Sequence, residues 1–319
     1  MKNRRLLSFG PVPSRRLGKS LGVNNIPPKN CSYSCVYCQL GKTVNKTIKR
    51  HAYYRSQNII REVNHKINET ISRNEKVDFI TFVPDGEPTL DINLKKEISL
   101  LKQFDKPIAV ITNSSLLWLE DVREDLLEAD LVSIKVDTVN EKMWKKINRP
   151  HKHLKFNLIL EGIQEFSKEF TGIIVSETML MGRIDYRNQF QKIAEFLGSL
   201  PNLNKIYIAI PTRPPAEKWV IPPTENIINR AYQEYSKILG EDKIEYLIGY
   251  EGNAFAFTGS AEDDLLSIIS VHPMRKEAVK IFLKKANTDF SIVEKLLDDE
   301  KIVELEYEGM EYYLRKLSG

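Results

Sequence analysis

Three cysteines within one short stretch are the residues of this 319-residue sequence with the most distinctive chemistry. Cys31, Cys35 and Cys38 form the pattern CxxxCxxC, and the chain has no further cysteine. An odd, clustered set cannot form a disulfide framework, but it can bind a metal centre where thiols stay reduced. Iron–sulfur clusters are normally held by four thiolates, so three would leave one iron open for an exchangeable ligand.

Three interpretations of the cysteines are open from the residues alone. A structural zinc site would take His51 as its fourth ligand, although the second cysteine pair usual in such sites is missing. Unrelated buried cysteines are the second interpretation, which their clustering disfavours. The third is a 4Fe–4S cluster whose open iron binds a substrate or cofactor directly.

The cysteines follow the first of six apolar runs that are rich in Ile and Val, as expected for parallel strands covered on both faces. Amphipathic helices are predicted between these runs, with N-caps at Asp91 and Asp185 and a stop at Gly198. Alternating strands and helices predict right-handed crossovers, and hence an α/β doubly wound sheet or partial barrel. The predicted strands are 20–26, 78–83, 108–113, 131–137, 172–181 and 205–211, and the helices are 56–73, 91–104, 120–129, 155–170 and 185–197.

Five prolines between residues 211 and 223 mark the exit from this unit, because proline cannot continue a helix or a central strand. We therefore predict two domains, residues 1–222 and residues 223–319. The second domain is predicted to begin with one helix and a short strand pair. Three helices and a terminal hairpin then follow the plan of a winged helix. These elements are 224–239, 244–250, 253–257, 261–271, 274–286, 290–300, 302–307 and 310–315.

Composition is that of a folded water-soluble protein, with 42% hydrophobic and 28% charged residues, which excludes a disordered or collagen-like chain. We find no secretory signal and no apolar run long enough to span a membrane. A cytoplasmic protein without membrane contact is expected.

Charge is distributed unevenly, although the formal net charge is only +4. Residues 1–61 contain thirteen Lys and Arg and no Asp or Glu, so the rest of the chain has a net charge of −9. The basic segment surrounds the cysteines and predicts an anionic substrate, with a merely solvated face as the alternative. Residues 289–311 carry nine acidic residues against two lysines. The winged element is therefore predicted to cover the site or bind a basic partner rather than nucleic acid.

The cysteine pattern, with Tyr37 just before its last cysteine, resembles the defining motif of the radical S-adenosylmethionine (SAM) superfamily. The stretches GPVPSRRLGKSLGVNN, CSYSCVYCQLG and PTRPPAE are similar to one branch of it, the proteins related to the wyosine-tRNA synthetases. This resemblance covers most of residues 5–220 and implies a partial (β/α)6 barrel that binds a 4Fe–4S cluster and SAM. The wyosine synthetases carry extra cysteines for a second cluster, so the resemblance implies a relative rather than the same activity.

The resemblance also implies roles at the ends of the predicted strands. The three cysteines would bind the cluster. Asp85, Gly86, Glu87 and Pro88 are similar to a GGE-type motif that meets the SAM amino group, with Asp85 in place of the first glycine. The Glu87 carboxylate would accept hydrogen bonds from that ammonium. Further SAM contacts are implied at Tyr37, Asn113, Ser133, Lys135, Asp137 and Met179.

We therefore predict a radical SAM enzyme that cleaves SAM reductively to a 5′-deoxyadenosyl radical, which abstracts hydrogen from RNA or a phosphorylated molecule. Flavodoxin or ferredoxin is the expected electron donor. Glu177, Arg183 and Arg213 are candidate substrate contacts, with ordinary surface charges or salt bridges as the alternative. A non-enzymatic regulator, with a zinc- or cluster-binding loop and a winged helix, is the alternative function.

Overall fold

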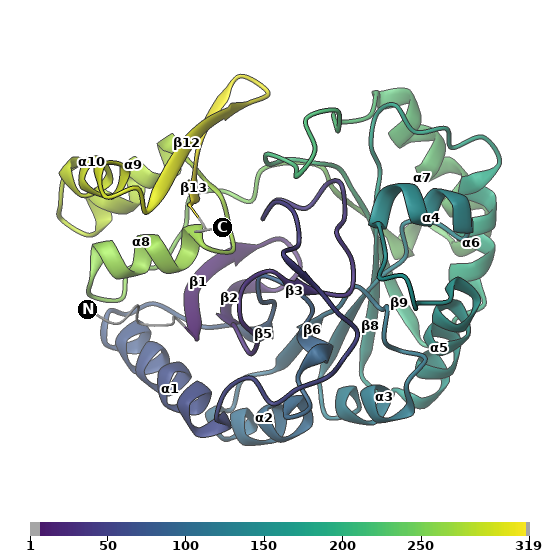
Figure 1. The fold of residues 1–319 in the computed structure, drawn as a ribbon, viewed down its shortest axis with the longest axis horizontal. Helices are drawn as coiled ribbons and strands as arrows, with labels where there is room; N and C mark the ends of the chain where they lie inside the picture. The colour runs from purple at the N-terminus through teal and green to yellow at the C-terminus, as the bar shows by residue number, and fades with distance from the viewer. Residues whose placement is uncertain (1–6, 317–319) are drawn as a thin grey trace.

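An eight-stranded sheet curled into a half-barrel dominates the computed structural model, which describes residues 7–316 (Figure 1). Its order is β1-β2-β5-β6-β7-β8-β9-β10. β1 is antiparallel to β2, and every later strand is parallel to its neighbour. The strands are β1 (Ser8–Ser14), β2 (Gly18–Val23), β5 (Phe79–Phe82), β6 (Ile108–Ile111), β7 (Leu131–Lys135), β8 (Ile173–Met179), β9 (Leu203–Ala209) and β10 (Ile244–Leu247).

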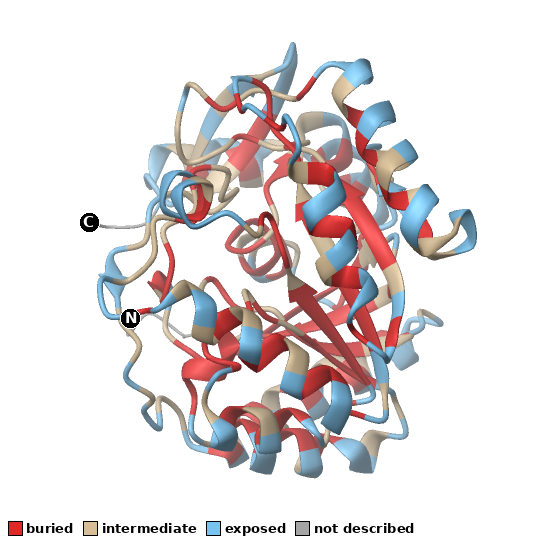
Figure 2. Cartoon of the chain, turned by 90° about the vertical axis from the view of Figure 1, so that its right-hand side faces the viewer, coloured by how far each residue is buried: buried red, intermediate tan, exposed pale blue. Residues whose placement is uncertain are grey.

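Helices cover the outer face of the sheet, with buried residues on their inner sides and exposed residues on their outer sides (Figure 2). In α1 the buried residues include Ile59, Val63 and Ile67, which recur at helical spacing. The helices are α1 (Ser56–Ser72), α2 (Leu94–Leu101), α3 (Glu120–Leu126), α4 (Glu141–Asn148), α5 (Phe156–Glu169), α6 (Gln189–Gly198) and α7 (Glu225–Leu239). Short 3₁₀ turns are η1 (Pro88–Leu90), η2 (Lys102–Phe104) and η3 (Glu241–Lys243).

The turn between β1 and β2 fills the inner side of the half-barrel. Its Leu17 packs with Leu131, Val175 and Tyr207, which come from β7, β8 and β9. A separate parallel pair, β3 (Asn30–Cys31) and β4 (Asn45–Lys46), carries the first cysteine. The polar residues of the predicted site lie nearer the carboxyl ends of the strands than this apolar layer.

The last part of the described chain forms a small antiparallel sheet with three helices. Its core is continuous with β1, because Phe9 and Val12 pack with Phe255 and Leu265. The sheet order is β11-β13-β12. The elements are α8 (Ala261–Ile269), β11 (Met274–Arg275), α9 (Lys276–Lys285), α10 (Ser291–Asp298), β12 (Ile302–Tyr307) and β13 (Met310–Arg315).

The predicted α/β partial barrel is confirmed, and its six predicted strands correspond to β2 and β5 to β9. The winged-helix assignment and the domain boundary after residue 222 stay predictions, although α7 and β10 continue the main sheet. Within residues 7–316, none of the helices has the length and apolar character to cross a membrane.

Several predicted details are wrong. The sequence pattern does not indicate β1, because Pro11 and Pro13 lie within it; proline is tolerated there since β1 is an edge strand. The predicted pair 244–250 and 253–257 does not form, because β10 pairs with β9 instead and 253–257 is not a strand.

Helix starts also differ from the prediction. Helix α4 is not predicted, yet Asn140 caps it by accepting a hydrogen bond from the Met143 amide at 2.9 Å. Helix α2 begins at Leu94 rather than after Asp91, because residues 91–93 form a turn in which the Asn93 amide donates to Asp91 Oδ1 at 2.9 Å. Helix α6 begins only at Gln189, and the exposed Asp185 pairs with Arg187 instead of capping it.

Candidate active site

The cysteine loop follows β2 and lies at the carboxyl end of the parallel strands (Figure 1). Main-chain hydrogen bonds hold it from two directions. The Val36 amide donates to the Ile147 carbonyl at 2.9 Å, and the Glu217 amide donates to the Val36 carbonyl at 3.0 Å. Helix α4 and the segment after β9 therefore form the scaffold of the loop.

Two asparagine side chains donate hydrogen bonds to cysteine sulfurs. Asn113 Nδ2 lies 3.4 Å from Cys31 Sγ, and Asn148 Nδ2 lies 3.5 Å from Cys35 Sγ. Burial raises the pKa of all three thiols, that of Cys35 to about 12, and neighbouring thiols add to the rise at Cys31 and Cys35. Three adjacent thiols, two of them with N–H donors at their sulfurs, fit the ligand set of an iron–sulfur cluster with one open iron.

His51 does not join the cysteines. It is exposed, and its ring centroid lies 5.8 Å from that of Tyr53. Among residues 7–316, no three His, Cys, Asp or Glu side chains are placed to hold a single metal ion. The cysteines of an iron–sulfur cluster bind different irons, so their sulfurs need not converge on one point.

Gly86 connects the motif after β5 to the cysteine loop. A Cβ atom on Gly86 would lie 2.0 Å from the Asn30 carbonyl oxygen, so the close approach of the two backbones requires glycine. The Glu87 amide donates to the same carbonyl at 3.0 Å. Pro88 is buried and begins η1. The motif and the loop therefore form one structural unit.

The Glu87 carboxylate is buried and accepts four hydrogen bonds from the protein itself. Oε1 accepts from the Thr89 amide at 3.1 Å, the Thr89 hydroxyl at 2.6 Å and the Thr112 hydroxyl at 2.7 Å. Oε2 accepts from the Asn113 amide at 2.7 Å. Burial raises the pKa of Glu87 against the effect of these donors. Glu87 thus fixes the end of β6 and the asparagine that reaches Cys31.

Asp85 differs from Glu87 in keeping one carboxylate oxygen without a partner. Its Oδ1 lies 3.1 Å from Lys29 Nζ, whereas its buried Oδ2 has no hydrogen-bond partner within the described part of the chain. Burial raises the pKa of Cys38, while Lys29 lowers it and Asp85 raises it further, so the charges of both side chains act on that thiol.

Asp137 connects several of the predicted residues. Its carboxylate accepts hydrogen bonds from the Tyr37 hydroxyl, from Asn148 Nδ2 at 2.8 Å and from the Met179 amide at 2.9 Å. Lys135 Nζ lies 3.7 Å from it. Asn148 could not be predicted from the sequence, because the helix that ends there carries no recognised motif.

Glu177 lies between two cations on the inner side of the half-barrel. Lys135 Nζ donates to one oxygen, and Arg16 Nη1 lies 2.8 Å from the other. Arg16 also donates to Ser133 Oγ at 3.0 Å. Burial alone would raise the pKa of Glu177, but the two cations lower it to about 2. Ser133, Lys135 and Glu177 are thus brought together, with Arg16 as a member that sequence reasoning missed.

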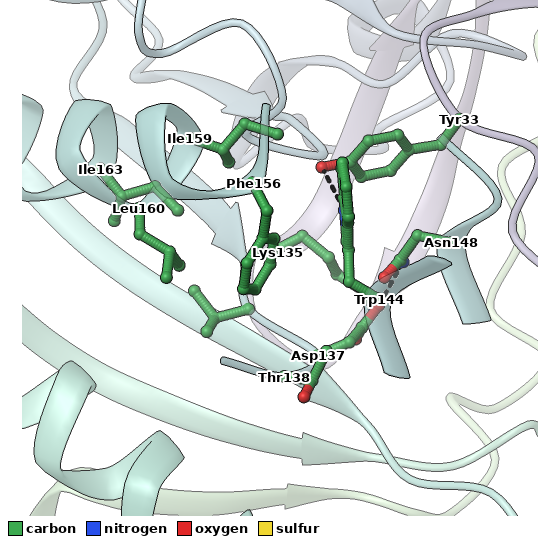
Figure 3. Close-up of a pocket in the computed structure, with 11 residues that line it drawn as sticks. Tyr33, Lys135, Asp137, Thr138, Trp144, Asn148, Phe156, Ile159, Leu160 and Ile163 are labelled. Atoms are coloured by element: carbon green, nitrogen blue, oxygen red, sulfur yellow. Dashed lines mark hydrogen bonds and ion pairs between the residues drawn. The ribbon is translucent and has the colours of Figure 1, made fainter. Parts of the chain in front are cut away.

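A cavity of about 20 Å³ lies beside this network, between the end of β7 and helices α4 and α5 (Figure 3). Polar side chains of Lys135, Asp137 and Asn148 meet apolar ones from α5 there. Trp144 Nε1 donates to the Tyr33 hydroxyl at 3.0 Å across it. The volume suits about one water molecule, so the cavity extends the polar network rather than holding a cofactor.

Arg213 links the cysteine loop to the C-terminal unit. It donates to Gln39 Oε1 at 2.8 Å, pairs with Glu251 at 2.5 Å and lies 2.7 Å from His272 Nε2. Gln39 in turn donates to a main-chain carbonyl that follows α8, at 3.1 Å. The third predicted substrate contact, Arg183, is exposed and is not brought into this group.

The half-barrel, the cysteine loop and the motif after β5 together define a class of protein. The profile of the Radical SAM superfamily matches residues 25–197, and the chain belongs to that superfamily. It is a radical SAM enzyme, a class that cleaves SAM with a 4Fe–4S cluster held by cysteines in this pattern.

Within the superfamily, the chain is a member of the UPF0026 family. It is 51% identical to the UPF0026 protein of Methanocaldococcus jannaschii, over 98% of this chain and 97% of that one. It is 29% identical to a UPF0026 protein of Helicobacter pylori, over 96% of each chain.

Solved structures share the fold at low identity. A radical SAM methyltransferase from Sphaerobacter thermophilus matches with a TM-score of 0.53 and 13% identity, over 71% of this chain and 66% of that one. TYW1 with a lysine–pyruvate adduct matches with a TM-score of 0.53 and 16% identity, over 68% and 73%. These likenesses concern the fold alone, so the resemblance to the wyosine branch stays a prediction.

Proposed function

We propose that this radical SAM enzyme abstracts hydrogen from an anionic substrate, with Cys31, Cys35 and Cys38 as the cluster ligands. When bound, the reduced cluster supplies the electron that cleaves SAM into methionine and the 5′-deoxyadenosyl radical. The observation that carries the proposal is the pair of asparagine N–H donors at the sulfurs of Cys31 and Cys35. Such donors favour the thiolates that a cluster needs, because a hydrogen bond donated to the charged sulfur stabilises it.

Asp85, rather than Glu87, is the carboxylate that we assign to the SAM ammonium. The oxygens of Glu87 already accept four hydrogen bonds, whereas Asp85 Oδ2 is buried without a partner among residues 7–316, and its charge acts on Cys38. An ammonium beside it would satisfy that buried acceptor. Glu87 then acts indirectly, by holding Asn113 in place.

Lys135 is the residue that we assign to the SAM carboxylate, because it is a half-buried cation within the network that links Tyr37, Asp137 and Met179. Arg15 and Arg16 are the cations that favour an anionic substrate, such as RNA or a phosphorylated molecule. Burial lowers the pKa of Arg15, with Glu251 and Glu177 opposing and Arg213 and Arg16 adding to the effect, so several cations are gathered at this point.

The C-terminal unit, whose elements follow the winged-helix plan, excludes water from the site in this proposal. Its contact with Gln39, next to the last cysteine, supports this role. Hydrogen abstraction by a carbon radical needs such shielding, because an exposed radical would be quenched.

Anaerobic reconstitution with iron and sulfide, followed by SAM and dithionite, tests the proposed function. A brown 4Fe–4S protein that forms 5′-deoxyadenosine is expected, and Cys35→Ala should abolish both properties. Cys35→Ser is the matched variant that keeps the size of the side chain. A colourless protein with stoichiometric zinc would overturn the proposal. Comparison of RNA and metabolites from a deletion strain then tests the substrate class.

A further inference from the structure

A basic collar surrounds the outer side of the cysteine loop. Segments far apart in the sequence meet in it: Lys42 Nζ lies 3.3 Å and Arg149 Nη1 2.5 Å from Glu217, and Lys46 Nζ donates to the Arg149 carbonyl at 3.1 Å. Arg149 is half-buried and the other five cations are exposed. We define the basic collar as Lys42, Lys46, Lys146, Arg149, Lys152 and Lys218.

The chain segments that carry the collar are hydrogen-bonded directly to the cysteine loop. The Thr47 amide donates to the Cys31 carbonyl at 3.0 Å, and the His151 amide donates to the Ser32 carbonyl at 2.8 Å. Figure 1 shows α4, which precedes Arg149, beside the purple loop. One layer of backbone therefore separates the collar from the cysteines.

The collar has a positive electrostatic potential, which acts on the neighbouring His151. Burial lowers the pKa of His151, and the neighbouring His153, Lys46 and Lys152 lower it further. Glu217, whose side chain is 18% exposed, is shared between two of the cations and does not neutralise the group. A patch of this kind attracts an acidic macromolecule and orients it during encounter.

An apolar side chain lies within the collar. Val44 is 77% exposed, between Lys42 and Lys46. An apolar contact among charged residues is typical of a protein interface. RNA-binding surfaces instead offer exposed aromatic rings for base stacking, whereas Trp219 beside the collar is half-buried and lies under Lys146 Nζ, 5.9 Å from its ring centroid.

We propose that the basic collar docks a small acidic electron-carrier protein, an inference that rests on the proposed function. The docked carrier would transfer one electron through the cysteine loop to the cluster held by the three cysteines. The carrier is thereby oxidised by one electron and the cluster reduced by one. No bond is formed or broken in this step. Docking here places the carrier next to the cysteines while the inner side of the half-barrel stays free for SAM and substrate.

Titration of the full-length protein with flavodoxin, at low ionic strength and by calorimetry, tests the docking surface. Replacing Lys152→Glu and Lys218→Glu together should raise the Kd about tenfold, since rim charges of one interface act through long-range attraction. The matched control is Lys95→Glu with Lys192→Glu, which makes the same charge change on exposed positions of α2 and α6 and should change the Kd less than about twofold. Added salt should weaken wild-type binding and reduce the difference in Kd between the wild type and the Lys152 and Lys218 variant.

Three results would overturn the proposal. Wild-type protein could show no saturable flavodoxin binding, both double variants could weaken that binding equally, or the Lys152 and Lys218 variant could lose binding to bulk tRNA and keep binding to flavodoxin. Dithionite-driven formation of 5′-deoxyadenosine separates this failure from failure of the proposed function. Dithionite needs no docking surface, so the Lys152 and Lys218 variant should keep wild-type rates with it. If wild-type protein forms no 5′-deoxyadenosine with dithionite, the proposed function fails instead.

Discussion

Glu87 can either contact SAM or stabilise the folded structure. Its four hydrogen bonds within the protein favour the structural role. Glu87→Gln should lower the free energy of unfolding of the cluster-free protein by about 1–3 kcal/mol, because an amide nitrogen cannot accept from the donors it would face. Urea unfolding followed by circular dichroism, without iron or SAM, measures this loss. Glu161→Gln on the exposed side of α5 is the control. Wild-type stability combined with weaker SAM binding would contradict the structural role.

Asn148 Nδ2 donates a hydrogen bond to the sulfur of Cys35 at 3.5 Å. Hydrogen bonds donated to cluster sulfurs raise the reduction potential, so Asn148→Leu should lower it by on the order of 50 mV. A redox titration of the reconstituted protein, followed by electron paramagnetic resonance, measures the potential. Asn157→Leu, at an exposed position of α5, should leave it unchanged. Equal potentials for both variants and the wild type would rule out the role.

At the scale of elements, the motif after β5 and the cysteine loop are joined at Gly86. In Gly86→Ala, the added methyl would overlap the Asn30 carbonyl and displace the segment that leads into Cys31. We expect the reconstituted variant to hold fewer than about two irons per chain instead of four. Iron and sulfide analysis measures this. Gly249→Ala has open space around its new methyl and should keep full iron content; if Gly86→Ala does too, the two elements are not coupled.

Helix α2 buries a titratable group away from the site. Burial, with Asp91 adding to its effect and Ser56 and Lys96 opposing it, raises the pKa of Glu97 to about 9. The folded protein keeps a proton that the unfolded chain releases near pH 4.5. The contribution of Glu97 to stability is therefore full below that pH and is lost as pH rises toward 9. Glu97→Gln removes this decline.

The variant should therefore gain on the order of 4 kcal/mol over the wild type between pH 5 and pH 8. Urea unfolding at pH 5, 6.5 and 8 gives the two profiles. Glu124→Gln, at an exposed position of α3, should follow the wild type at each pH. Parallel profiles for Glu97→Gln and the wild type would show that Glu97 is ionised in the folded protein.

The parallel strands could be predicted because each is a short Ile- and Val-rich run, and the cysteine spacing indicated the metal chemistry directly. What could not be predicted depends on contacts between distant segments. Asn148 approaches Cys35 only because an unpredicted helix lies against the loop, and Glu87 meets β6 only across the sheet. Likewise, nothing local in the sequence of β10 shows that it pairs with β9.

At the scale of the whole molecule, the basic segment at the start of the chain is divided between two faces. Arg15, Arg16 and Lys29 lie on the inner side near the site, where Glu251, Glu177 and Asp85 pair with them. Lys42 and Lys46 lie on the outer collar. Lys2, Arg4 and Arg5 lie outside the described residues. One run of charge can thus favour an anionic substrate inside and an acidic partner outside.

We expect the core shared between β1 and the C-terminal unit to make the chain unfold as one cooperative unit, whereas the predicted division after residue 222 would let the two parts unfold separately. Phe9 is 2% exposed and packs with residues of the C-terminal unit such as Phe255. Phe9→Ala should cost about 3–4 kcal/mol. Trp118, Trp144 and Trp219 all lie in the first 222 residues, so tryptophan fluorescence reports on the half-barrel and circular dichroism on the whole chain.

Cooperative unfolding requires that both signals shift to the same lower urea midpoint in Phe9→Ala. Leu296→Ala is the matched variant, because Leu296 is fully buried in α10 and has its contacts in the C-terminal core. Its cavity should also lower the fluorescence midpoint, although no tryptophan is near it in the sequence. If Leu296→Ala lowers the circular dichroism midpoint and leaves fluorescence unchanged, the C-terminal unit unfolds by itself and the division after residue 222 describes a real domain boundary.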